Sequence, residues 1–137
     1  MSAFHFVLSA ICIGFANTAI EWFFIGYLFH KYQATTPQTW RAESYVSYTY
    51  STVLSIVFGL LFTFFYLKIG SHYVIGHSIL SDAKLGIICF ACFSFIAEIG
   101  NSIYVNLDKM FVAGKLLASC LSYIAAAVIA GLFFWWE

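Results

Sequence analysis

Long apolar runs separated by short polar stretches dominate this sequence. Four of the runs are long enough to cross a membrane, because a transmembrane helix needs about 20 apolar residues. The runs do not alternate apolar and polar positions, as the shorter strands of a membrane β-barrel do. The pattern therefore predicts an all-α fold, a four-transmembrane-helix bundle that forms a single membrane domain over residues 1–137. The expected spans are residues 6–29, 48–67, 85–104 and 111–136.

Composition narrows the class of protein further. Hydrophobic residues make up 63% of the chain and charged residues only 9%, whereas a soluble domain is about half apolar and about a quarter charged. Six Lys and Arg residues balance six Asp and Glu residues, so there is no basic excess that would attract nucleic acid. These proportions exclude an ordinary soluble enzyme, a disordered chain and a nucleic-acid-binding protein. They make the lipid bilayer the expected partner.

The basic residues are distributed unevenly between the two sides of the expected bundle. Lys68 and Lys84 lie in the second connection, on the same side as the two termini. Cytoplasmic loops of membrane proteins carry an excess of Lys and Arg, so the bias predicts that both termini lie outside the cytoplasm. The other four basic residues, on the side of the first and third connections, are Lys31, Arg41, Lys109 and Lys115.

Two glutamates interrupt the apolar spans. Glu21 lies nine positions before His30, where the first span ends. Glu98 lies ten positions before Asp108, where the third span has ended. The first and third spans cross the membrane in the same direction, and an α-helix rises about 1.5 Å per residue, so both carboxylates are expected about 13–15 Å from the same membrane face. Ionisable residues within a span usually face the bundle interior or a cavity.

Other polar residues accompany each glutamate. Asn17 shares a helix face with Glu21, Asn101 shares one with Glu98, and Lys115 enters the fourth span from the same membrane face. One lysine neutralises one carboxylate, so the second must be protonated, shared or hydrated by a cavity. Two interpretations stay open: a polar network that fixes helix register, and a proton or ligand site. We expect no metal ion, since two glutamates without a nearby histidine are a poor transition-metal site.

Small residues recur at every fourth position of the last span. Helices in lipid approach each other closely through such positions, because there is little hydrophobic drive between them. The stripe is either an internal packing face or the contact face of a homo-oligomer. Four helices hide little interior, so we expect a homo-oligomer through this face. The stripe consists of Gly114, Ala118, Ser122, Ala126 and Ala130.

Motifs that indicate covalent chemistry are scarce. Cys89 and Cys92 form a C-x-x-C pair, which can indicate redox chemistry. At about 100° per residue, both lie away from the Glu98 side of the helix, and we interpret them as packing residues. The chain contains no glycine-rich phosphate loop and no nucleophile elbow. We therefore expect no catalytic residue, no cofactor and no enzyme activity.

The end of the first span carries a motif that resembles a known family. Residues 21–31 (EWFFIGYLFHK) are similar to a motif in which Trp is followed by Tyr or Phe and, a few residues later, by Leu-Phe-Gly-Lys. This motif closes the first helix in a bacterial family of small four-helix membrane proteins of unknown function. Residues 101–104, 107–109 and 113–114 resemble the turn between the third and fourth helices of that family. The chain lacks the proline usual in the first motif and has His30 where the family has glycine.

The resemblance implies a four-helix fold and a place in the bacterial inner membrane, and it implies no established activity. Two function hypotheses follow. The first is a structural or accessory membrane protein that forms a homo-oligomer or joins a larger complex, with a buried polar layer of Glu and Lys. The alternative is a small proton-coupled transporter that uses Glu21, Glu98 or both, an analogy in architecture to small multidrug-resistance exporters.

Overall fold

The structure is a computed structural model that describes residues 2–40, 44–74 and 78–135. Arg41, which contributes to the predicted charge bias, lies outside the described residues, as does residue 136, the predicted end of the fourth span. The described residues form four helices long and apolar enough to cross a membrane, at Ala3–Leu28, Tyr45–Tyr73, Ile79–Tyr104 and Lys109–Trp135. No β-strand occurs within those residues. The prediction of an all-α bundle of four transmembrane helices is confirmed.

Three of the four spans change helix type along their length. The first span joins α1 (Ala3–Glu21) to the π-helix η1 (Trp22–Leu28). The second joins α2 (Tyr45–Phe65) to the π-helix η4 (Tyr66–Gly70) and the short α3 (Ser71–Tyr73). The third consists of α4 (Ile79–Cys89), the π-helix η5 (Phe90–Phe95) and α5 (Ile96–Tyr104). The fourth is the uninterrupted α6 (Lys109–Trp135). The first connection contains two 3₁₀-helices, η2 (His30–Thr35) and η3 (Pro37–Thr39).

The connection between the second and third spans is shorter than predicted. The sequence assigned residues 68–84 to it, whereas the second span continues to Tyr73 and the third begins at Ile79. Ser78 starts the third span early, because its hydroxyl accepts a hydrogen bond from the backbone N–H of Ser81 at 3.2 Å and caps the helix. Asp82 therefore lies inside a membrane-length helix and not in a loop.

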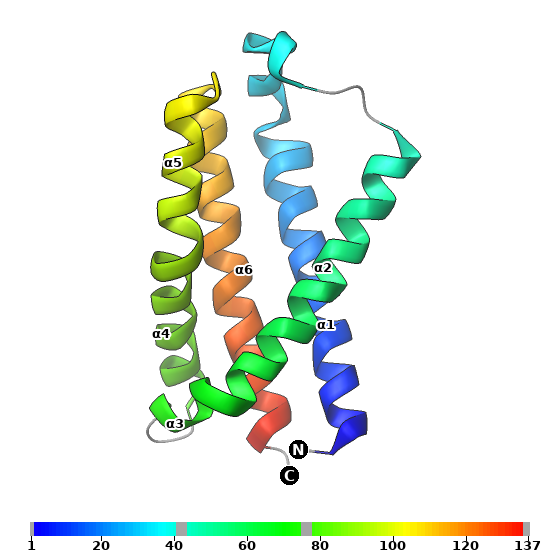
Figure 1. The fold of residues 1–137 in the computed structure, drawn as a ribbon, viewed down its shortest axis with the longest axis vertical. Helices are drawn as coiled ribbons and strands as arrows, with labels where there is room; N and C mark the ends of the chain where they lie inside the picture. The colour runs from blue at the N-terminus through cyan, green and yellow to red at the C-terminus, as the bar shows by residue number, and fades with distance from the viewer. Residues whose placement is uncertain (1, 41–43, 75–77, 136–137) are drawn as a thin grey trace.

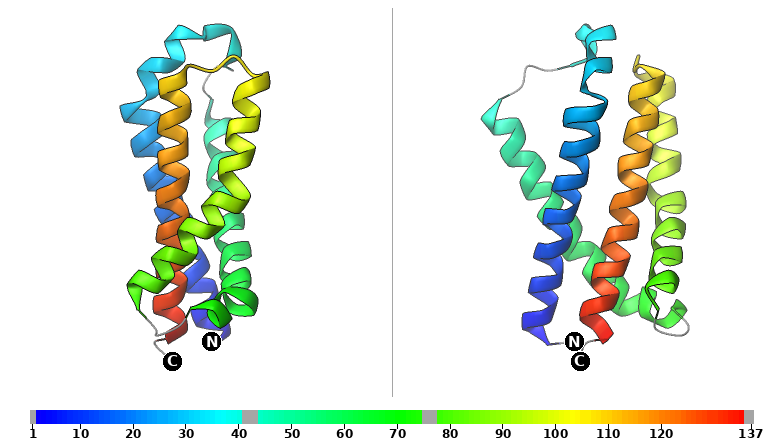
Figure 2. Two further views of the ribbon diagram at one scale, coloured as in Figure 1. Left: turned by 90° about the vertical axis from the view of Figure 1, so that its left-hand side faces the viewer. Right: turned by 180° about the vertical axis from the view of Figure 1, so that it is seen from behind.

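The second span crosses the bundle obliquely (Figure 1). The α1 and α6 helices run side by side, and α4 and α5 follow α6 on its other side. The α2 helix lies against the bundle near the end that holds both termini and diverges from α1 toward its own N-terminus, as the right-hand view in Figure 2 shows. The bundle is therefore closed at the end with the termini and open at the other end.

Glycine positions set the α1–α2 crossing. A Cβ atom on Gly59 would overlap the backbone carbonyl of Ala10, and one on Gly14 would lie 3.1 Å from the Cα atom of Ile56. The two backbones are in direct contact at this point, which is the geometry that small residues permit between membrane helices. The buried apolar core lies on the closed side of the crossing and includes Ile13, Phe62, Tyr66, Val74, Leu85, Cys89, Ala126, Ala127 and Ala130.

The small-residue stripe of α6 faces the interior of the single chain. Ala118, Ala126 and Ala130 are each 1% exposed, and Ser122 is 4% exposed. Gly114 is covered by the ring of Phe29, which a Cβ atom at this position would overlap. The predicted homo-oligomer contact through these five residues is therefore wrong, because the chain's own helices already occupy that face. The stripe serves as an internal packing face.

Candidate binding pocket in the membrane domain

The open half of the bundle contains a polar pocket of about 500 Å³. It lies between α1, α2, the middle of the third span and α6. It forms because α2 leaves the bundle there: every residue from Ser44 to Leu54 is exposed. The small size of the serines that line it also leaves space between the helices. The polar lining consists of Asn17, Glu21, Ser47, Tyr50, Ser51, Ser55, Ser94, Glu98, Ser119, Ser122 and Tyr123.

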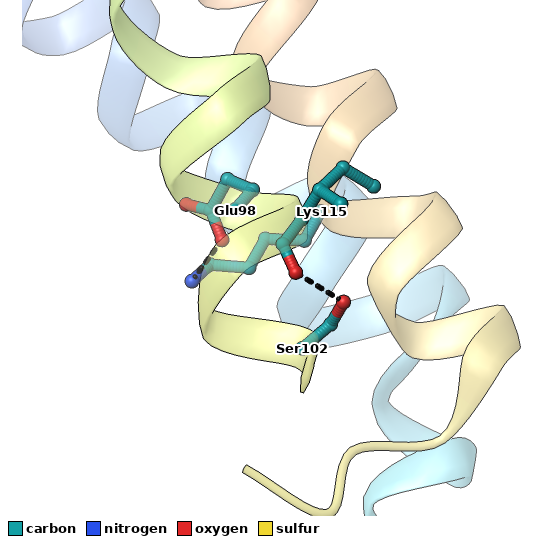
Figure 3. Close-up of polar contacts among 4 residues, drawn as sticks. Glu98, Ser102 and Lys115 are labelled. Atoms are coloured by element: carbon teal, nitrogen blue, oxygen red, sulfur yellow. Dashed lines mark hydrogen bonds and ion pairs between the residues drawn. The ribbon is translucent and has the colours of Figure 1, made fainter. Parts of the chain in front are cut away.

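Glu98 and Lys115 form an ion pair beside this pocket. The Lys115 Nζ atom lies 2.7 Å from a carboxylate oxygen of Glu98, and the Glu98 side chain is only 17% exposed. Figure 3 shows the lysine side chain of α6 reaching across to α5, with the Ser102 hydroxyl donating to the backbone carbonyl of Ile99, the residue after Glu98. Lys115 was expected near the carboxylates because it enters the fourth span from the same membrane face, and the structure pairs it with Glu98. The pair joins the third and fourth spans and neutralises one of the two carboxylates.

Glu21 lines the same pocket from the last turn of α1. Its carboxylate is close enough to Lys115 and Glu98 for electrostatic interaction with both. Its side chain is exposed, and within the described part of the chain it makes no hydrogen bond and no ion pair. The pocket thus contains one paired carboxylate and one carboxylate without a partner of its own.

Two further side chains define the inner end of the pocket. The Asn17 amide donates a hydrogen bond of 2.9 Å to the Ser55 hydroxyl, which ties α1 to α2 where the helices begin to diverge. The Ser122 hydroxyl is buried and has no hydrogen-bond partner among the described residues. An unsatisfied buried hydroxyl costs about 1–3 kcal/mol, and Ser122 lines the pocket, so a polar molecule bound there can satisfy it.

Asn101 does not belong to this site. Its side chain is exposed, and it does not line the pocket. Three residues along a helix correspond to a rotation of about 300°, so Asn101 points about 60° away from Glu98. Because α6 covers only the Glu98 side of α5, that rotation leaves Asn101 on the outside. The expectation that it accompanies the carboxylates is wrong for this reason.

A buried carboxylate at the closed end of the bundle was not predicted from the sequence. Asp82 is 3% exposed and Tyr66 is 1% exposed. The Tyr66 hydroxyl donates a hydrogen bond of 2.6 Å to an Asp82 carboxylate oxygen. Gly131 packs so closely on this carboxylate that a Cβ atom would overlap it. Starting the third span at residue 85 left Asp82 in a loop, although Ser78 four positions earlier is a typical helix N-cap.

The cysteines lie apart from the carboxylates. All four are free, and none lines the pocket. Cys89 is buried in the core, whereas Cys92 is exposed. Among the described residues, no three His, Cys, Asp or Glu side chains are grouped closely enough to hold a metal ion.

No protein-family model, curated protein or solved structure matches this chain.

Proposed function

We propose that this four-helix membrane protein is a small proton-coupled carrier, not an enzyme, and that Glu21 is its exchangeable carboxylate. The observation that carries the proposal is the unpaired Glu21 side chain in a polar pocket of about 500 Å³. A pocket of this size, lined by a few convergent polar groups, is typical of small-molecule sites. Ionisable residues within membrane spans mark substrate and proton pathways more often than other positions do.

The charges of the pocket explain why Glu21 and not Glu98 is assigned this role. Lys115 compensates Glu98 at 2.7 Å. The negative charge of Glu21 is left over, and a charge in a low-dielectric site must be neutralised by a proton or a bound cation. Alternation between those two states is the elementary step that a proton-coupled carrier requires.

We expect the Glu21→Gln variant to lose proton movement without losing its fold. Purified wild-type protein in liposomes should collapse an imposed pH gradient when an exchangeable cation is supplied on the side that the protons enter, read from an entrapped pH-sensitive dye. The Glu21→Gln variant should not, because the amide keeps hydrogen-bonding capacity but cannot release a proton. Its thermal unfolding in detergent should match that of the wild type. Tyr104→Phe is the control, since Tyr104 is 90% exposed and lies outside the pocket.

The same experiment separates the carrier from an accessory membrane protein. The N-terminal half of α2 favours this second candidate, because its serine and tyrosine residues are exposed on all faces, and hydroxyl groups in lipid form hydrogen bonds to neighbouring helices. A homo-oligomer or a larger complex would cover that surface. Folded wild-type protein that moves no protons would contradict the carrier and support this candidate.

The location and orientation belong to the same proposal. The four membrane-length helices support a place in a membrane, and the resemblance of the motif at residues 21–31 favours the bacterial inner membrane. Both termini lie at one end of the bundle (Figure 1), and the basic residues favour that end outside the cytoplasm. A C-terminal reporter that is active only in the cytoplasm should therefore stay silent, and a bright signal would reverse the orientation.

A further inference from the structure

A second pocket lies on the other side of Glu21. It has a volume of about 400 Å³ and lies between the end of the first span and the N-terminal half of α2. Glu21 and Ser51 line both this pocket and the pocket that contains Glu98. The unpaired carboxylate therefore forms part of the wall between two pockets and can be approached from either one.

The lining of the second pocket favours one class of ligand. Glu21 supplies a negative charge, and the Trp22 and Tyr48 side chains supply aromatic rings. Among the described residues that line it, there is no Lys and no Arg. A carboxylate next to aromatic rings is the combination that binds organic ammonium ions, because the ring faces attract a cation and tolerate its apolar substituents. The hydroxyls of Thr18 and Thr52 donate to backbone carbonyls of their own helices, and their oxygen atoms can still accept a hydrogen bond in this pocket.

The local backbone explains how Trp22 reaches this position. The π-helix η1 begins at Trp22, and its end is marked by a hydrogen bond of 2.8 Å from the Phe29 N–H to the Phe24 carbonyl, five residues back. π-Helical turns are rare and frequently occur at functional sites. Gly26 lies under the indole: a Cβ atom there would be 3.4 Å from the Trp22 Cδ1 atom. The ring thus packs along its own helix beside the Glu21 carboxylate and not into the bundle core.

An aromatic belt at the membrane surface is the simpler explanation for exposed Trp and Tyr residues. It accounts for Tyr27, which is 69% exposed on the same π-helix and does not line the pocket. It does not account for a cavity that Trp22 and Tyr48 share with an unpaired carboxylate. Tyr27 and Trp22 therefore offer a matched comparison of a belt residue and a pocket residue.

We propose that the pocket between η1 and α2 binds a small organic ammonium ion, with Glu21 as its counter-charge, and that this ion and a proton exclude each other at Glu21. The ion occupies the second pocket, and its apolar part contacts the Trp22 and Tyr48 rings. When the ion binds, the Glu21 carboxyl releases its proton; when the ion leaves, the carboxylate takes up a proton again. This inference names the substrate class for the proposed carrier and rests on the role of Glu21 in it.

The groups around Glu21 determine how the binding of the organic ion depends on pH. Lys115 of α6 and Glu98 of α5 interact with Glu21 electrostatically and are paired with each other. His30 of η2 and Tyr48 of α2 share the second pocket, and Tyr50 of α2 shares the first. Protonation of Glu21 at low pH removes the negative charge of the pocket, so the affinity for an organic cation must fall as pH falls.

Benzyltrimethylammonium is a suitable probe, because it carries a permanent charge and any pH dependence of its binding comes from the protein. Equilibrium dialysis against the purified protein in detergent should show saturable binding that weakens as the pH falls, approaching about tenfold per pH unit once the free Glu21 is protonated, as expected when one proton competes with one ion. In weakly buffered solution, at a pH low enough to weaken binding, addition of the probe should release protons. The Glu21→Gln variant should lose the binding and the proton release. The Trp22→Leu variant should bind between about 2-fold and 30-fold more weakly, the range expected for one cation–π contact.

Controls distinguish this inference from the carrier function itself. The Tyr27→Leu variant should bind as the wild type does, and benzenesulfonate should not bind. Binding that is independent of pH, or that Trp22→Leu and Tyr27→Leu weaken equally, would overturn the inference even if Glu21 moves protons in liposomes. Binding with the expected pH dependence, together with an absence of proton movement in liposomes, would support the pocket and contradict the carrier.

Discussion

Replacing Gly59 with alanine is expected to destabilise the protein by about 3 kcal/mol, at the upper end of the usual cost of overpacking. The added methyl group would overlap the backbone carbonyl of Ala10. A clashing side chain can rotate away, but a backbone carbonyl moves only if α1 and α2 separate along the crossing. Thermal unfolding in detergent, followed by circular dichroism, measures the loss.

Gly100 provides the control for this substitution. A Cβ atom on Gly100 meets no atom within 4 Å, so the Gly100→Ala variant should be as stable as the wild type or more stable by up to about 1 kcal/mol, the helix-propensity difference between the two residues. Equal effects of the two substitutions would contradict the close α1–α2 crossing. That crossing also sets the angle at which α2 leaves the bundle, so Gly59→Ala should change ligand binding in the pocket as well.

The four spans and the contact between Glu98 and Lys115 were predictable from the sequence, whereas the tilt of α2 was not. Apolar runs of about 20 residues predict transmembrane helices, and the membrane face from which Lys115 enters the fourth span predicted its approach to Glu98. The tilt depends on local contacts, here the glycines of α1 and α2, and span length does not determine it. Without that tilt, the sequence could not predict a pocket beside Glu21.

The small-residue stripe and Asp82 show two other limits of structure prediction from this sequence. A stripe such as Ala118 to Ala130 requires a close neighbour but does not identify it, since a helix of the same chain and a helix of a second copy fit equally well. Asp82 was missed because a charged residue near the end of an apolar run was treated as the end of the span. Its hydrogen bond with Tyr66 joins positions 16 residues apart, and no periodic pattern in either helix indicates that pairing.

The hydrogen bond between Tyr66 and Asp82 is expected to be the strongest polar coupling in the closed half of the bundle. Its length of 2.6 Å is typical of a hydroxyl that donates to a carboxylate, and both side chains are almost fully buried. Removing the donor in Tyr66→Phe leaves a buried carboxylate with one hydrogen bond fewer. The cost should be about 2–3 kcal/mol, since hydrogen bonds to charged groups contribute about 1.5–3 kcal/mol.

A double-mutant cycle isolates this interaction from the other contacts of the two residues. The free energies of unfolding of wild type, Tyr66→Phe, Asp82→Leu and the double variant should give a coupling of at least about 1 kcal/mol, as expected for residues in direct contact. Asp82→Asn alone should cost less than Asp82→Leu, because the amide oxygen still accepts from Tyr66. Tyr73→Phe is the control, since Tyr73 lies in the same span and is 72% exposed. A coupling below about 0.5 kcal/mol, the level at which distant sites add independently, would mean that the tyrosine and the aspartate are not paired in the membrane. The second span would then lack this polar anchor at the closed end, and the open pocket at its other end would have to be held by the glycine crossing alone.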